Sequence, residues 1–129
     1  MTTDDDFRAA GKEIQGRLWP ATRTAPAGQF PAAKLAPEFF DYVQQTAFGM
    51  IWSREGLAVR DRSMITVAML AALGHQEELR SHLMGALSVG LSRDELVEVL
   101  MQVAVYAGVP AAVAAFRTAA DVLLPEDDR

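Results

Sequence analysis

The chain has 129 residues, of which 50% are hydrophobic and 22% are charged. This length suits one compact domain, and this composition indicates a packed core rather than disorder. The net charge of −5 comes without a cluster of Lys and Arg, so binding of nucleic acid through its phosphates is not expected. The absence of cysteine excludes disulfides and thiolate chemistry, and it suits a reducing compartment.

The N-terminal residues, MTTDDDFRAAGKE, are acidic and lack the apolar core of a signal peptide. No apolar run is long enough to span a bilayer. We therefore expect a cytoplasmic protein that does not bind membranes.

The first half of the chain is predicted to hold two helices and a connector. A first helix is predicted over residues 5–18, with its acidic start at the positive end of the helix dipole. Residues 20–37 hold four of the six prolines and are predicted to be an extended surface connector. A second helix is predicted to begin at Pro37, and Gly49 is expected to end or bend it.

Four more helices are predicted in the second half, each ended by glycine or proline. The third of the four opens with a capping box, because Ser92 is followed by Glu95, and Leu91 and Leu96 are placed as its hydrophobic staple. No stretch alternates as a strand does, so we predict an all-α fold of about six helices. The four predicted helices cover residues 60–73, 76–89, 92–107 and 110–124.

Two of these helices are apolar on more than one side. Between residues 64 and 73 only Thr66 is polar, and the helix over 92–107 carries a second row of apolar residues opposite its first. A helix that is apolar all round must be buried on all sides, and a bundle of this size has few such positions. We therefore expect a homo-oligomer. Tyr106, in the last turn of the second helix, is expected to lie in the core.

His75, Glu78 and His82 lie at spacings of three and four, and the chain has no other histidine. Glu78 and His82 share one face of the predicted helix, where the carboxylate would raise the pKa of the imidazole and suit it to acid–base chemistry. An ordinary exposed Glu–His pair has the same spacing. A metal site would use all three residues but would need a fourth ligand. The spacing does not decide between these.

Other polar residues adjoin apolar runs. Trp52 and Arg54 could line a pocket or cap a helix end. Arg60 and Arg62 flank the start of the helix over 60–73, where positive charge opposes the helix dipole. This conflict favours a role for one of them, such as pairing with Glu78 or an acidic ligand.

The stretches FGMIWSREGL, RDRSMITVAMLAALGHQEELRSHLMGALSVGLSRDELVEVLMQ and VYAGVPAAVAAFR, within residues 48–122, resemble the carboxymuconolactone decarboxylase family. This family belongs to the wider group that contains the alkyl-hydroperoxidase D proteins. The resemblance implies an all-α helical bundle of that type, assembled as a homotrimer or homohexamer. It also implies one domain over residues 1–129, with a divergent N-terminal helix and Pro/Ala-rich connector over 1–37.

The resemblance favours acid–base catalysis by Glu78 and His82. In the peroxidase branch this helix carries Cys-x-x-Cys before a histidine, and aligning that histidine with His82 places His75 and Glu78 at the cysteines. Dithiol peroxidase chemistry is therefore excluded, and the chain resembles the cysteine-free decarboxylases. The reference substrate, 4-carboxymuconolactone, loses its carboxylate to give a delocalised carbanion, so neither a metal nor an organic cofactor is expected. The residues expected to bind a small substrate are Trp52, Arg54, Arg62, His75 and Tyr106.

The chain departs from the family pattern at several positions. Glu55 and Ala58 stand where Pro and Asp are common, and His75 and Gln76 replace a more usual pair. The region that corresponds to the divergent segment over 20–37 helps to close the pocket in relatives. A biosynthetic enzyme acting on a larger lactone or enolisable acid, by decarboxylation, isomerisation or ring opening, is therefore a first alternative. A non-catalytic oligomeric binding or scaffold protein is a second.

Overall fold

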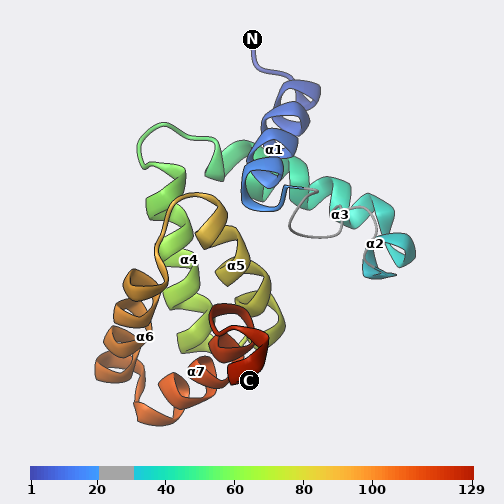
Figure 1. Cartoon of the computed structure of the whole chain (residues 1–129). Coiled ribbons are helices and arrows are strands. Elements are labelled where there is room, and N and C mark those ends of the chain that lie inside the picture. Colours follow the sequence, from blue (N-terminus) through green and yellow to red (C-terminus); the bar gives the residue numbers. More distant parts are fainter. Residues whose placement is uncertain (21–30) are drawn as a thin grey trace. The chain divides into compact units, whose positions relative to one another are not determined.

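The computed structural model describes residues 1–20 and 31–129, and within them it is all-α, as the sequence predicts (Figure 1). The chain forms two compact units, Met1–Val59 and Arg60–Arg129. That the two units make one domain stays a prediction. The first unit holds α1 (Asp4–Leu18), α2 (Pro31–Leu35), α3 (Pro37–Val43) and the π-helix η2 (Gln44–Trp52). Helix α4 (Val59–Leu73) begins with the last residue of the first unit and otherwise belongs to the second. The second unit also holds α5 (Gln76–Ser88), α6 (Arg93–Ala107), α7 (Val109–Leu123) and the 3-10 turn η3 (Glu126–Asp128).

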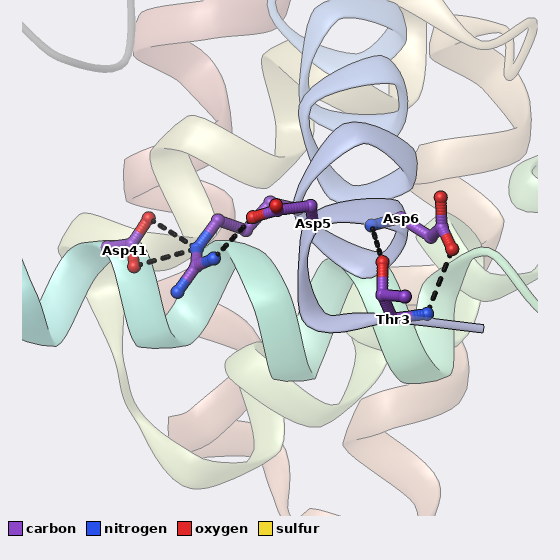
Figure 2. Close-up of polar contacts among 5 residues, drawn as sticks. Thr3, Asp5, Asp6 and Asp41 are labelled. Carbon is purple, nitrogen blue, oxygen red and sulfur yellow. Dashed lines mark hydrogen bonds and ion pairs between the residues drawn. The ribbon is translucent and has the colours of Figure 1, made fainter. Parts of the chain in front are cut away.

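The first helix, α1, begins with a capping box. The Asp6 backbone N–H donates to Thr3 Oγ1 at 3.2 Å, and the Thr3 backbone N–H donates to Asp6 Oδ2 at 2.8 Å, as Figure 2 shows. These hydrogen bonds hold the pKa of the Asp6 carboxyl below its usual value. Arg8 contacts both Asp5, at 2.9 Å, and Asp41 of α3, at 3.0 Å (Figure 2). The start of α1 is thereby tied to α3.

Helix α1 packs closely on η2 through two buried glycines. A Cβ atom on Gly11 would lie 2.0 Å from the Gln44 carbonyl oxygen, and one on Gly49 would lie 2.1 Å from the Phe7 carbonyl oxygen. Only glycine allows backbones to approach this closely. Apolar side chains from both helices complete the core of this unit: Ile14, Leu18 and Phe48.

The structure corrects two predictions in this unit. Residues 31–35 of the expected extended connector form α2, a helix that begins at a proline, while residues 21–30 lie outside the described residues. The helix that begins at Pro37 does not end at Gly49, but continues as the π-helix η2 to Trp52. The glycine here serves the close approach of α1 rather than helix termination.

In the second unit the predicted helix boundaries are confirmed to within a residue or two. Gly74 has φ +77°, a conformation that favours glycine, and the His75 backbone N–H returns to the Leu70 carbonyl at 3.0 Å. Only Gly74 and His75 separate α4 from α5. The capping box of Ser92 and Glu95 at the start of α6 is also confirmed.

The core of this unit lies among α4, α5, α6 and α7. Arg80 of α5 forms an ion pair with Asp121 of α7 at 2.6 Å, and Thr118 of α7 donates to Gln76. These contacts fix α7 against the start of α5. The buried apolar residues at the centre are Val67, Ala71, Leu79, Leu83, Ala86, Leu91, Leu96, Leu100, Val103, Ala115 and Ala119.

The second apolar faces of α4 and α6 are exposed in the single chain. On α4, Met69 is 52% and Leu73 is 68% exposed, and on α6, Val105 is 72% exposed. Among the described helices, none is long and apolar enough to cross a membrane.

Candidate active site

Glu78 and His82 lie one turn apart on α5, as their spacing predicts. Leu79 and Leu83, both fully buried, fix the inner face of this helix against the core. His82, next to Leu83, is half-buried, whereas Glu78 is exposed. The helix therefore places an imidazole at the edge of the core and a carboxylate at the surface beside it.

Burial decides the charge of His82. It lowers the pKa of the imidazole to about 4, and the charge of Glu78 offsets only part of this effect. The prediction that the pKa would be raised is therefore wrong, because an exposed carboxylate stabilises the imidazolium less than loss of water destabilises it. At neutral pH His82 is an uncharged imidazole, which accepts a proton before it can donate one.

His75 occupies the N-cap of α5, just outside the helix, and its side chain makes no capping hydrogen bond. It is exposed. Within residues 1–20 and 31–129, no group of three or more His, Asp and Glu side chains could hold a metal ion.

The two arginines at the start of α4 differ in their surroundings. Arg60 forms an ion pair with Glu95, whose carboxyl has its pKa lowered chiefly by this contact. Arg62 is half-buried, and its Nε atom has no exposed surface. Arg60 therefore pairs with Glu95 rather than with Glu78, and the binding of an acidic ligand by Arg62 stays a prediction.

Tyr106 lies in the last turn of α6 and is 86% exposed in the single chain. The expectation that it lies in the core is wrong for the single chain, because Tyr106 belongs to the exposed apolar side of α6. Its place in a substrate pocket stays a prediction.

Trp52 and Arg54 belong to the unit Met1–Val59. Trp52 is the last residue of η2, and its ring stacks on Phe48 with centroids 5.7 Å apart. Arg54 follows the helix and is exposed. Trp52 therefore packs in the aromatic core of its own unit, and its grouping with His82 stays a prediction.

Ser63 is a polar residue that the sequence analysis missed. It is fully buried on α4, one turn before Val67 and two turns before Ala71, on the core face of that helix. Its hydroxyl has no hydrogen-bond partner among the described residues. A serine in an apolar row at four-residue spacing is the signal that could have identified it.

Comparison with known protein families identifies one that matches most of the chain. The profile of the carboxymuconolactone decarboxylase family matches residues 37–121, which is more than half of the chain. The chain belongs to this family. Its matched segment contains η2 and all of α4, α5 and α6, and therefore every predicted site residue.

Two curated members of known name are similar to the chain. The 4-carboxymuconolactone decarboxylase of Acinetobacter baylyi is 41% identical over 85 residues, which are 66% of this chain and 63% of that protein. The nitrosuccinic acid decarboxylase npaB of Metarhizium robertsii is 31% identical over 75 residues, or 58% of this chain and 52% of that protein. The chain thus matches less than two thirds of the length of either relative.

An uncharacterized 15.0 kDa protein of Paracoccus denitrificans, from the nqo9-nqo10 intergenic region, is 29% identical over 97 residues, which are 74% of this chain and 72% of that protein.

Proposed function

We propose that the chain is a cofactor-independent decarboxylase of a small unsaturated lactone acid like 4-carboxymuconolactone. The observation that carries the proposal is the Glu78–His82 pair on α5, within the segment that matches the family. An imidazole at the edge of a core, with a carboxylate one turn away, has the parts needed for acid–base chemistry. The names of two similar proteins support decarboxylation as the reaction.

The chemistry consists of one bond cleavage and one proton transfer. The bond between carbon and the carboxylate breaks, carbon dioxide leaves, and the electron pair moves into the conjugated lactone carbonyl as a dienolate. Protonation of carbon then completes the product. Because the negative charge is delocalised onto oxygen, the protein needs only to orient the substrate, stabilise that oxygen and supply the proton.

His82 donates the proton, and the charge of Glu78 raises the pKa of the His82 imidazole. With a pKa of about 4, His82 is neutral in the free protein at pH 7. A substrate carboxylate beside it favours the imidazolium, so binding of the anion and uptake of a proton occur together. The proton taken up on binding is then delivered to carbon. Within the unit that holds His82, Arg62 holds anionic groups of the substrate, and His75 and Tyr106 line the substrate pocket.

The names of the two similar decarboxylases indicate a shared substrate type. Nitrosuccinic acid and 4-carboxymuconolactone both carry two carboxyl groups and an electron-accepting group, a nitro group in one and a lactone carbonyl in the other. One carboxylate leaves and the other stays. By analogy, the substrate of this chain is a dicarboxylic acid whose carbanion is stabilised by a neighbouring acceptor.

A second candidate is a biosynthetic enzyme of the same family that acts on a larger lactone or enolisable acid. The family match begins at residue 37, so α1 and α2 lie outside it. A family member that keeps the reaction centre but has a different N-terminal segment would differ in its substrate more readily than in its chemistry.

The test is decarboxylation of 4-carboxymuconolactone by the purified protein and by His82→Ala. We expect the substitution to lower kcat at least about 100-fold, because a general acid contributes about that factor or more. Circular dichroism should show an unchanged helix content. Full activity of His82→Ala would disprove the assignment.

A matched pair of glutamates separates the role of Glu78 from a general effect of charge. Glu77 and Glu78 are adjacent, exposed and both in the first turn of α5. Glu78→Gln should shift the pH profile and reduce kcat, whereas Glu77→Gln should leave both unchanged. Equal effects of the two substitutions, or no effect of either, would reduce Glu78 to surface charge.

A further inference from the structure

Helix α4 exposes an apolar row that ends at an acidic side chain. Asp61, Ile65 and Met69 follow one another at four-residue spacing, so they lie along one face of the helix. Ile65 and Met69 are exposed in the single chain, and the Asp61 side chain is partly exposed. The row is therefore apolar toward the C-terminal end of α4 and negatively charged at its N-terminal end.

Helix α7 carries a row of the same length that ends at the opposite charge. Val109, Val113 and Arg117 also follow one another at four-residue spacing, and all three side chains are exposed. In this row the two valines come first along the chain and the arginine comes last. The charge therefore lies toward the C-terminal end of α7 and is positive.

The two charged side chains are available for a contact with another molecule. Asp61 approaches Arg60 only to 3.8 Å, and Arg60 forms a closer ion pair with Glu95. Arg117 takes part in none of the ion pairs found over residues 1–20 and 31–129. Neither charge is therefore neutralised by a close contact within the chain.

The two rows match each other when the helices run antiparallel. Four residues of an α-helix rise about 6 Å, so the steps along both rows are equal. A parallel alignment would set each charged side chain against an apolar one, which is unfavourable once the contact excludes water. In the antiparallel alignment the facing residues are Asp61 with Arg117, Ile65 with Val113, and Met69 with Val109.

The next residue of the α4 row extends the apolar contact. Leu73 lies four residues beyond Met69, so in the antiparallel alignment it passes the start of α7. At that point Gly108, with φ +102°, connects α7 to the end of α6, where Val105 and Tyr106 are exposed. A helix that follows the α7 row would thus bring its Leu73 to this exposed end of α6.

We infer that the α4 row of one subunit packs antiparallel on the α7 row of a second copy of the chain. A second copy is the occupant because the acidic row and the basic row that match each other are both present, and both uncovered, on one chain. Burial of the apolar side chains supplies the affinity, and the ion pair at the end of the contact fixes its direction. The inference does not depend on the proposed function.

Charge reversal in the full chain, followed by analytical ultracentrifugation, tests the pairing. Asp61→Lys and Arg117→Glu each set like charges opposite each other, so each should weaken self-association about 10-fold or more. The double variant has an opposite pair again and should associate within about threefold of wild type.

Asp94→Lys is the matched control for the charge reversal. Asp94, like Asp61, lies in the first turn of its helix, but it is exposed on α6 outside both rows. This variant should associate as wild type does. Single variants that associate like wild type, or a double variant that associates no better than they do, would overturn the pairing. A wild type that stays monomeric would overturn it as well.

Because the chain has no cysteine, a disulfide can test which residues face each other. Ile65→Cys combined with Val113→Cys should give chains linked through an intermolecular disulfide on a non-reducing gel after mild oxidation. Each single variant should remain unlinked, because like rows do not meet. A link in either single variant, or none between chains of the double variant, would overturn the pairing.

Discussion

At the scale of single residues, His82 couples the stability of the protein to pH. Its pKa is about 4 in the folded chain and about 6.5 when unfolded, so between these values the unfolded state binds more protons. Stability should therefore be full above pH 6.5 and fall as the pH drops toward 4. Wild type should lose as much as about 3 kcal/mol more than His82→Gln over this range.

Denaturant unfolding at several pH values between 4 and 7 measures this difference. Carboxylates with lowered pKa values, such as Asp6 and Glu95, are present in both proteins, and their contributions cancel. Parallel stability curves for wild type and His82→Gln would show that His82 is not buried as a neutral imidazole. The expected excess loss would establish the charge state from which the proposed proton transfer begins.

The spacing of residues in the sequence predicted which side chains lie next to each other on a helix, but it did not predict what packs against them. The position of Glu78 one turn before His82 follows from helix geometry, and it is confirmed. The direction of the His82 pKa shift depends on what packs against the imidazole, which a local pattern does not contain. Ser63 stands in an apolar row at four-residue spacing, which marks it as a candidate, but only the structure shows that its side chain is fully buried.

At the scale of elements, the contact between α1 and η2 depends on two glycines. Alanine at Gly11 or Gly49 would place a methyl group about 2 Å from a backbone carbonyl oxygen, so the helices must separate. We expect either substitution to destabilise the protein by about 2–4 kcal/mol, the cost of disrupting core packing. Gly16→Ala, also on α1, meets nothing within 4 Å and should instead stabilise by about 0.5–1 kcal/mol.

Thermal unfolding followed by circular dichroism distinguishes these variants. A Gly11→Ala protein as stable as Gly16→Ala would contradict the close packing of the two helices.

Sequence reasoning predicted the helices of the second unit better than those of the first. Capping residues and glycines predicted the helices of the second unit, because those signals are local. Two elements of the first unit were not predicted. The π-helix η2 forms where its backbone closely approaches that of α1, and α2 lies in a segment whose prolines predicted a connector.

At the scale of the whole molecule, α4 and α6 carry more apolar surface than the single chain buries. Each helix packs one apolar row into the core of its own unit and exposes another. The sequence predicted apolar faces in excess of what one chain can cover, and the single chain exposes them. Self-association through these faces would bury them, and it would enclose Tyr106 at the end of α6.

We therefore expect the protein to sediment as a trimer or hexamer, and Met69→Glu to shift it toward the monomer. Met69 lies at the middle of an exposed row on α4 with Ile65 and Leu73, and a carboxylate there would have to be buried without a partner in any interface that covers the row. Lys12→Glu, at an exposed position of α1, introduces the same side chain outside that row and should leave the assembly intact. Analytical ultracentrifugation over a range of concentrations measures both outcomes. A monomeric wild type, or a Met69→Glu variant that assembles like wild type, would show that this row is not a subunit contact, and the apolar excess of α4 would then require a different partner.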